Sequence, residues 1–447
     1  MNQKPTILCV NPWIHDFAAY DFWSKPLGLL SLAGLLRQCG CTIFYIDCTD
    51  RFHPRARASP DPPSRFGRGP YRKSRLPRPP GLTHLPRHFS RYGIAPEWFR
   101  DDLRALPTPD LVLVTSIMTY WYPGTEETIA RIKEIFPQVP VILGGIYATL
   151  CPDHARENSR ADEIAPHVSE TDILDLVARH TGASWSVDYN AGAPATRSWP
   201  AFDLQHKITY IPLLTGRGCP FACPYCASNY LDPEMSRRDP AEVVREIEYW
   251  HRTFGVRDFV FYDDALLINA EFHFLPLAER LLRKRLPLRF HTPNALHIRA
   301  VNETTAPLMK KLGFETIRLG LETAAFDNRT AFDAKVTRAE FQRAVSCLRT
   351  AGFDRRQTGA YLLVGLPRQS LEVVEESIRI VRAAGLTPIP TYYSPIPHTL
   401  MWPAAVAASP YDLEADPIFA NNAVFPCTPE GFSWETITRL KGLSGRT

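Results

Sequence analysis

Three cysteines stand within eight residues of one another, in the segment T-G-R-G-C-P-F-A-C-P-Y-C at positions 215–226. Thiolates are soft ligands, so three of them on one tight loop can each hold one iron of a 4Fe–4S cluster and leave the fourth iron open. An open iron can bind a substrate-like group and pass one electron into it. The alternative is a zinc knot or a set of buried thiols, but zinc knots normally pair C-x2-C units, and no second pair follows downstream.

The residues after this loop alternate between β-branched or aromatic runs and stretches with helical apolar spacing. This alternation predicts an α/β fold, a partial (β/α)6 barrel, with its active site at the carboxyl ends of the strands. The cysteine loop follows the first predicted strand directly. The six predicted strands are 210–214, 259–262, 288–291, 316–320, 360–364 and 391–394, with helices such as 241–254 and 339–351 between them.

The N-terminal part shows the same alternation and predicts a doubly wound, flavodoxin-like parallel sheet, whose strand ends can hold a ligand. A stretch at about 51–107 is dense in proline and arginine, and we expect it to be an irregular basic insertion. The predicted elements are strands at 6–11, 42–47, 111–116 and 139–143 and helices at 27–39 and 126–136. The predicted domains are 1–183, a linker at 184–205, a core at 206–400 and a C-terminal extension at 401–447.

The C-x3-C-x2-C spacing, with the aromatic Tyr225 directly before the last cysteine, resembles the radical S-adenosylmethionine (SAM) superfamily over about Ile208 to Thr399. The resemblance implies that Cys219, Cys223 and Cys226 ligate a 4Fe–4S cluster and that SAM is a cofactor. It implies further that reductive cleavage of SAM gives a 5′-deoxyadenosyl radical that abstracts hydrogen. A reductant such as flavodoxin or ferredoxin would then be a partner.

Charged residues at the ends of two predicted strands match places where the superfamily binds SAM. Asp263 and Asp264 end the second strand, where the resemblance implies groups that face the SAM amino end; capping of the next helix is the alternative. Arg318 and Glu322 end the fourth strand, and strand alternation puts both on one face. The resemblance implies that Arg318 meets the SAM carboxylate and Glu322 its ammonium or ribose, whereas an internal ion pair is the alternative.

Three later segments also resemble superfamily motifs. Gly365 and Pro367, in G-A-Y-L-L-V-G-L-P, resemble the fifth-strand motif that passes the adenine, although a plain strand-to-helix turn has the same residues. His291 and Asn294 end the third strand and either face the substrate or belong to the core. In the closing P-I-P-H-T segment, His398 replaces the superfamily's glycine.

A doubly wound domain before such a barrel resembles the cobalamin-binding domain of one branch of the superfamily. The residues that carry this resemblance also suit any flavodoxin-like sheet. The Asp-x-His-x-x-Gly cobalt-ligand signature is absent, with only His15-Asp16 in the corresponding loop, and the branch's Gly-Glu-Gly-Glu stretch survives only as H-V-S-E at 167–170. The matches implied to contact cobalamin are Asn11-Pro12, Lys25–Leu29, Ser116 after the third strand, and Gly144 and Gly145 after the fourth.

The aromatic residues at 13–23 and 118–124 could line a cofactor cavity or an apolar interface. The net charge is only +4 on 447 residues, so the composition does not predict binding to nucleic acid or to an anionic membrane. No targeting segment and no run of roughly 18 apolar residues appears, so we expect a cytoplasmic protein. Ten cysteines are too scattered for a disulfide framework.

These patterns favour a radical SAM enzyme that performs cobalamin-dependent methyl transfer to an unactivated carbon. The alternative within enzymes is a SAM-dependent rearrangement, cyclisation or oxidation in which the first domain is a scaffold that binds no cobalamin. A non-catalytic iron–sulfur protein for electron transfer or binding is the alternative of another class. The substrate, a small molecule or peptide, does not follow from the fold.

Overall fold

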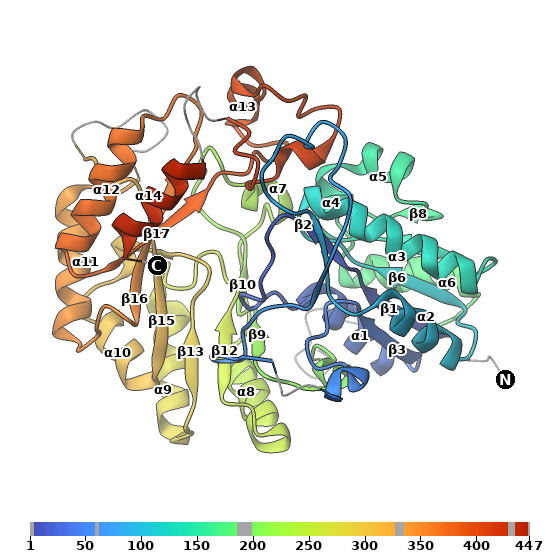
Figure 1. Ribbon diagram of the computed structural model, residues 1–447. Coiled ribbons are helices and arrows are strands. Elements are labelled where there is room, and N and C mark those ends of the chain that lie inside the picture. Colours follow the sequence, from blue (N-terminus) through green and yellow to red (C-terminus); the bar gives the residue numbers. More distant parts are fainter. Residues whose placement is uncertain (1–3, 59–61, 186–198, 327–334, 428–433, 446–447) are drawn as a thin grey trace. The chain divides into compact units, whose positions relative to one another are not determined.

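The computed structural model describes residues 4–58, 62–185, 199–326, 335–427 and 434–445 (Figure 1). Contacts divide the chain into two compact units, Met1–Thr209 with Leu413–Val424, and Tyr210–Asp412 with Phe425–Thr447. The segment 401–447, which the sequence suggests is one extension, is thus shared between both units. Among the helices that the structure describes, none has the length and apolar character needed to cross a membrane.

The first unit is built on a five-stranded parallel sheet with the order β3-β1-β6-β7-β8. Because β1 lies between β3 and β6, the order is that of a flavodoxin-like sheet, and the predicted doubly wound fold is confirmed. The strands are β1 (Thr6–Asn11), β3 (Thr42–Asp47), β6 (Leu111–Val114), β7 (Val141–Leu143) and β8 (Glu163–Ile164).

Alternation along β1 supplies both faces of this sheet with apolar side chains. Ile7 and Cys9 pack with residues of α1 and α6 on one face, whereas Leu8 and Val10 pack with residues of α2 and α3 on the other. The strands are therefore buried on both sides, which explains their continuous apolar runs. These helices are α1 (Leu27–Gln38), α2 (Pro96–Ala105), α3 (Tyr122–Ile135) and α6 (Glu170–Thr181), and α4 (Ile146–Leu150) and α5 (Pro152–Asn158) follow β7.

Only part of the Pro/Arg-rich segment at 51–107 is irregular. It contributes two strands of a small antiparallel sheet with the order β2-β5-β4, and it ends in helix α2. Pro96 is accommodated because it opens α2, where a helix needs no amide hydrogen. The added elements are β2 (Ile14–Asp16), η1 (Pro54–Ala58), β4 (Lys73–Arg75) and β5 (Ser90–Tyr92).

A buried arginine organises the irregular part of this segment. Arg51 is 4% exposed, and its guanidinium donates hydrogen bonds to the carbonyl oxygens of Pro63 at 2.6 Å, Gly67 at 2.9 Å and Pro70 at 3.1 Å. The carboxylate of Asp21 balances its charge at 3.5 Å. A proline-rich loop has few backbone donors, and Arg51 supplies donors from its side chain.

The second unit is a partial barrel of six parallel strands in the order β9-β12-β13-β15-β16-β17, which confirms the predicted (β/α)6 fold. Figure 1 shows its helices following one another around the strands. The strands are β9 (Ile211–Leu213), β12 (Asp258–Phe261), β13 (Arg289–His291), β15 (Phe314–Glu322), β16 (Thr358–Val364) and β17 (Thr387–Tyr392). The main helices are α8 (Pro240–Phe254), α9 (Phe274–Lys284), α10 (Thr305–Leu312), α11 (Arg338–Thr350) and α12 (Leu371–Ala383).

The last strand begins earlier than its prediction at 391–394. Pro388 and Pro390 suggest a break in the strand, but β17 lies at the edge of the described sheet, where it pairs with β16. A proline amide that faces away from the partner strand costs no ladder hydrogen bond. Four further helices are α7 (Ser228–Leu231), α13 (Trp402–Ala408), η8 (Pro417–Ala420) and α14 (Trp434–Ser444), of which α14 is the last.

Candidate active site

The cysteine loop starts at the carboxyl end of β9, where a partial barrel holds its reacting groups. The short strands β10 (Gly216–Arg217) and β11 (Ser236–Arg237) pair at its base. Gly218 has φ 74°, and a Cβ there would lie 2.5 Å from the carbonyl oxygen of Glu234, so the turn requires glycine. Two backbone bonds fix the loop, from Cys226 N to Cys223 O at 3.0 Å and from Met401 N to Pro224 O at 2.8 Å.

The three thiols fit a cluster better than a single metal ion. All ten cysteines are free; Cys226 is exposed, whereas Cys219 and Cys223 are half-buried. Within the described residues, no three His, Cys, Asp or Glu side chains gather around one ion position. In a 4Fe–4S cluster each thiolate holds a different iron, so the donors need not converge on one point. The donor set on this loop therefore suits the predicted cluster.

Hydrogen-bond donors surround the sulfurs. The Oγ of Ser228 lies 3.1 Å from Cys226 Sγ, and the Ser228 amide donates to the same sulfur at 3.4 Å. His297 Nε2 lies 3.7 Å from Cys219 Sγ. Burial raises the pKa of both Cys219 and Cys223, so the thiols hold their protons at neutral pH until metal binding displaces them.

The two adjacent aspartates at the end of β12 have different surroundings. Asp263 is 3% exposed and accepts hydrogen bonds from the amide of Thr215 at 3.1 Å and from its hydroxyl at 2.6 Å. Burial raises its pKa to about 6. Asp264 is half-buried and accepts from Asn294 Nδ2 at 3.3 Å, and burial raises its pKa as well. Asp263 therefore joins the ends of two strands, whereas Asp264 lies beside Ser228, which follows the last cysteine of the loop and hydrogen-bonds to it.

Glu322 ends β15 beside the thiols, in an ion pair with a lysine that the sequence analysis does not single out. Lys335 Nζ lies 2.9 Å from Glu322 Oε1. Burial opposes the charge of Lys335, but Glu322, Cys223 and Cys219 hold its pKa above the ordinary value. Burial and the neighbouring Glu322 and Cys223 raise the pKa of Tyr225. The structure thus gathers Tyr225, Glu322 and Lys335 around Cys223.

Arg318 is not gathered with these groups. Its guanidinium donates to the carbonyl oxygens of Ile317 at 2.9 Å and Gln357 at 3.5 Å, and Gln357 precedes the first residue of β16. The side chain therefore points toward the amino end of the sheet, opposite to Glu322. Regular strand alternation predicts that Arg318 and Glu322 lie on the same face of the strand. A register shift between Gly320 and Glu322 interrupts this alternation in β15.

Gly365 and Pro367 follow β16 in a turn held by a side chain. Gly365 has φ 87°, and the amides of Gly365 and Leu366 donate to Gln369 Oε1 at 2.8 and 3.3 Å. Nothing in this turn contradicts a role beside an adenine, and that role stays a prediction. His398 has φ 67°, which explains why the superfamily favours glycine there. Its ring stacks on Tyr230 with 4.2 Å between centroids.

The third strand supplies one core residue and one site residue. His291 is 0% exposed and bonds to Thr316 and Asp258, each at 3.1 Å, so it belongs to the core. Asn294 bonds to the carbonyl oxygen of Tyr262 at 2.6 Å. His297, which lies three residues further on, was missed by the sequence analysis; its only signal was a position shortly after a strand end.

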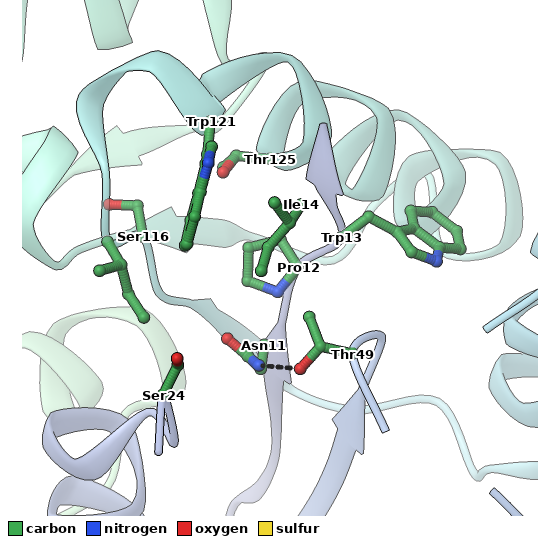
Figure 2. Close-up of a pocket in the computed structure, with 10 residues that line it drawn as sticks. Asn11, Pro12, Trp13, Ile14, Ser24, Thr49, Ser116, Trp121 and Thr125 are labelled. Atoms are coloured by element: carbon green, nitrogen blue, oxygen red, sulfur yellow. Dashed lines mark hydrogen bonds between the residues drawn. The ribbon is translucent and has the colours of Figure 1, made fainter. Parts of the chain in front are cut away.

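The first unit has a pocket at the carboxyl ends of β1, β3 and β6 (Figure 2). Ser116 lines it and donates from Oγ to the carbonyl oxygen of Gly144 at 2.7 Å. Gly145 has φ 88°, and a Cβ there would lie 2.3 Å from the carbonyl oxygen of Ser116, so this crossing requires glycine. The predicted residues Ser116, Gly144 and Gly145 therefore lie together. The pocket is lined by Asn11, Pro12, Trp13, Ile14, Ser24, Thr49, Ser116, Ile117, Trp121 and Thr125.

Two neighbouring residues of β2 hold the wall of this pocket. Asp16 is 2% exposed and accepts from Trp121 Nε1 at 2.6 Å, which fixes the indole at the pocket. His15 Nε2 lies 3.1 Å from Glu127, and burial lowers the His15 pKa. His15 is therefore engaged within the protein, and it is not among the residues that line the pocket.

The sequence of this chain is similar to one protein family and to several known proteins. Residues 213–381 match the family model described as the Radical SAM superfamily. The anaerobic magnesium-protoporphyrin IX monomethyl ester cyclase of Rubrivivax gelatinosus is 27% identical over 61% of this chain and 54% of its own length. An uncharacterised methyltransferase of Pyrococcus horikoshii is 24% identical over 67% of this chain and 70% of its own. The chain spans about half the length of the cyclase, 54%.

A solved structure covers both units. The radical SAM methyltransferase TsrM from Kitasatospora setae, with cobalamin and a [4Fe-4S] cluster bound, matches with a TM-score of 0.64 at 16% identity, over 91% of this chain and 76% of its own. This likeness is one of fold. The match of residues 213–381 to this family implies a 4Fe–4S cluster and SAM as cofactors and the need for a reductant. Residues 213–381 therefore form a radical SAM domain, and the chain has the fold of the superfamily's cobalamin-dependent branch.

Proposed function

We propose that the enzyme uses cobalamin together with the cluster and SAM to transfer a methyl group to an unactivated carbon. The observation that carries this proposal is the pocket of the first unit, at the carboxyl ends of a flavodoxin-like sheet. Such strand ends are the usual ligand site of this sheet class. The lining mixes polar residues such as Asn11, Ser24 and Thr49 with apolar ones such as Trp121, as is usual for a ligand pocket.

The pocket residues suit a flat macrocycle with a polar tail. The indole of Trp121, which Asp16 holds by a 2.6 Å hydrogen bond, offers a rigid apolar plane. Asn11, Ser24 and Thr49 bring amide and hydroxyl groups to the pocket. Gly144 and Gly145 lie against Ser116 and position it in the pocket wall. Since His15 is held by Glu127, we expect bound cobalamin to lack a histidine ligand from this loop. Bound cobalamin would supply a transferable methyl group.

In the second unit, Cys219, Cys223 and Cys226 would hold the cluster, and reduced cluster would supply the electron that cleaves SAM. Asp264 and Glu322 are the carboxylates beside the loop and would bind the positive parts of SAM. The turn with Gly365 and Pro367 would accept its adenine, and Tyr225 would pack against Cys223. Asp263 would act indirectly, because its hydrogen bond holds Thr215 in place at the start of the cysteine loop. Arg318 reaches SAM only if its side chain turns away from Gln357.

The second candidate function is a rearrangement, cyclisation or oxidation without methyl transfer. It is favoured by the relative at 27% identity, which is a cyclase and therefore closes a ring. In that case the enzyme would cleave SAM and abstract hydrogen, and the first unit would retain no cobalamin. The reductant, of the flavodoxin or ferredoxin class, would be shared by both candidates.

The test is anaerobic reconstitution of the whole chain with iron, sulfide, SAM and hydroxocobalamin, followed by reduction with dithionite. We expect a 4Fe–4S absorbance, cobalamin that remains after gel filtration, and formation of 5′-deoxyadenosine. Cys223→Ala removes one iron ligand, so we expect it to lose both the cluster and 5′-deoxyadenosine while it retains cobalamin. Cys39→Ala is the matched control, because Cys39 is a half-buried thiol of the first unit.

Each outcome separates the candidates. Cluster formation and SAM cleavage without retained cobalamin would reject methyl transfer in favour of the second candidate. Full formation of 5′-deoxyadenosine by Cys223→Ala would contradict the cluster assignment itself. If cobalamin is retained, replacement of Trp121 by Leu weakens retention, since it removes the planar wall of the pocket.

A further inference from the structure

A histidine outside the motifs described above lies against one of the three cysteines of the loop. His297 belongs to β14 (Leu296–His297), which pairs with β15 so that His297 lies opposite Gly320. This pairing brings the imidazole to the cysteine loop, with Nε2 at 3.7 Å from Cys219 Sγ. The ring of Phe221 packs against the imidazole with 4.2 Å between centroids. Both the strand and the aromatic ring therefore fix the direction of Nε2.

The chemistry of a bound thiolate determines the direction of this hydrogen bond. A thiolate sulfur has no proton and can only accept, so Nε2 must carry the hydrogen once Cys219 is bound to iron. The backbone amide of Phe221 also donates to Cys219, so this sulfur would accept two hydrogen bonds. The sulfur of Cys226 has Ser228 as its neighbour, whereas the imidazole of His297 lies against the sulfur of Cys219.

We propose that His297 tunes the iron–sulfur cluster: its Nε2–H donates to Cys219 Sγ and stabilises the reduced, more negative state of the cluster. Hydrogen bonds to cluster sulfurs are among the known controls of reduction potential. The reduction adds one electron, which the external reductant supplies, and the histidine retains its proton. The inference rests on the proposed assignment of the cluster to Cys219, Cys223 and Cys226.

Other charged groups near the sulfurs call for a control. Lys335 pairs with Glu322 at 2.9 Å, and Arg299 pairs with Glu340 at 3.0 Å on the surface. Lys335 and Arg299 both act electrostatically on His297. A substitution at His297 removes a directed donor, whereas a substitution at Arg299 removes only a nearby charge. Comparison of the two variants therefore separates hydrogen bonding from general electrostatics.

The experiment is a redox titration of the reconstituted cluster in the whole chain, followed by electron paramagnetic resonance without SAM. We expect His297→Phe to make cluster reduction about tenfold less favourable, which lowers the midpoint potential by ~59 mV for one electron. His297→Gln retains an N–H donor and should restore at least half of this shift. Arg299→Gln should leave the potential nearly unchanged.

The outcomes distinguish this inference from the proposed function. If the wild-type chain forms no cluster, the proposed function fails before His297 is tested. If the clusters of wild type and His297→Phe have equal potentials, the tuning role is rejected and the cluster assignment stands. A nitrogen coupling that shows His297 bound directly to iron would also reject the hydrogen bond. If His297→Phe does not fold, the comparison of wild type with His297→Gln and His297→Ala decides.

Discussion

At the scale of single residues, the site depends on which of two similar side chains faces the core. Asp263 and Asp264 are neighbours in sequence, but Asp263 is 3% exposed and bonded to Thr215 through both oxygens. Arg237 lies 3.6 Å from it, too far for a strong hydrogen bond. Hydrogen bonds favour the charged carboxylate, but burial outweighs them and raises the pKa to about 6.

This burial predicts a pH-dependent stability. The folded chain binds the Asp263 proton more tightly than the unfolded chain, with a pKa of about 6 against an ordinary 3.8. The difference corresponds to on the order of 3 kcal/mol. Stability from this group is therefore present at low pH and is lost as the pH rises from about 4 to above 6. We expect the Tm of the wild type, relative to that of Asp263→Asn, to fall as the pH rises through this range.

The measurement is calorimetry of the cluster-free protein at several pH values. The amide side chain of the Asp263→Asn variant cannot ionise, so its contribution to the stability of the folded chain does not change with pH. Parallel Tm curves for the wild type and the variant would show that Asp263 is ionised throughout the range, and the assigned effect of burial would then be wrong.

At the scale of elements, the Pro/Arg-rich segment shows how a side chain can replace backbone pairing. The carbonyl oxygens of Pro63, Gly67 and Pro70 converge on Arg51, which is 4% exposed. A buried guanidinium that loses its partners, or carbonyls that lose their donor, cost free energy because water cannot reach them. The fold of the loop therefore depends on this residue.

We expect Arg51→Gln to open the loop, because glutamine is shorter and carries no charge to balance Asp21. The cost of local opening should fall by about 3 kcal/mol. Exposed trypsin sites lie in the loop at Arg65 and just after it at Arg72, so cleavage after these residues should become many times faster, as mass spectrometry can measure. Arg55→Gln is the control, since Arg55 is 40% exposed and pairs with Asp101 on the surface. Equal cleavage rates for both variants would refute the role of Arg51.

At the scale of the whole molecule, the chain crosses from the second unit back to the first. Residues 413–424 belong to the first unit by their contacts. Asn421 is 0% exposed and donates to Asp16 Oδ1 at 2.9 Å, while Asp416 accepts from the hydroxyl of Tyr122 at 3.1 Å. Asp16 also holds Trp121, so a C-terminal residue helps to fix the pocket wall.

We expect Asn421→Leu to destabilise the first unit by about 1 to 3 kcal/mol, because Asp16 loses a buried donor. Hydrogen exchange should become faster at 14–18 and 118–122, whereas cluster formation in the second unit should not change. Asn158→Leu, at the end of α5, is the control within the same unit. Unchanged exchange at 14–18 in Asn421→Leu would mean that the crossing segment does not support the pocket.

Local patterns in the sequence determined most of the elements and the cysteine motif, because strand alternation, helical spacing and ligand spacing each involve residues close in sequence. The parallel order of both sheets followed from those elements. The tertiary structure decided which side chains meet: His297 and Lys335 beside the thiols, Arg318 away from Glu322, Arg51 within its loop and Asn421 at Asp16. Those contacts join residues that are far apart in sequence, and their partners are set by strand register, burial and loop closure, which no local pattern encodes.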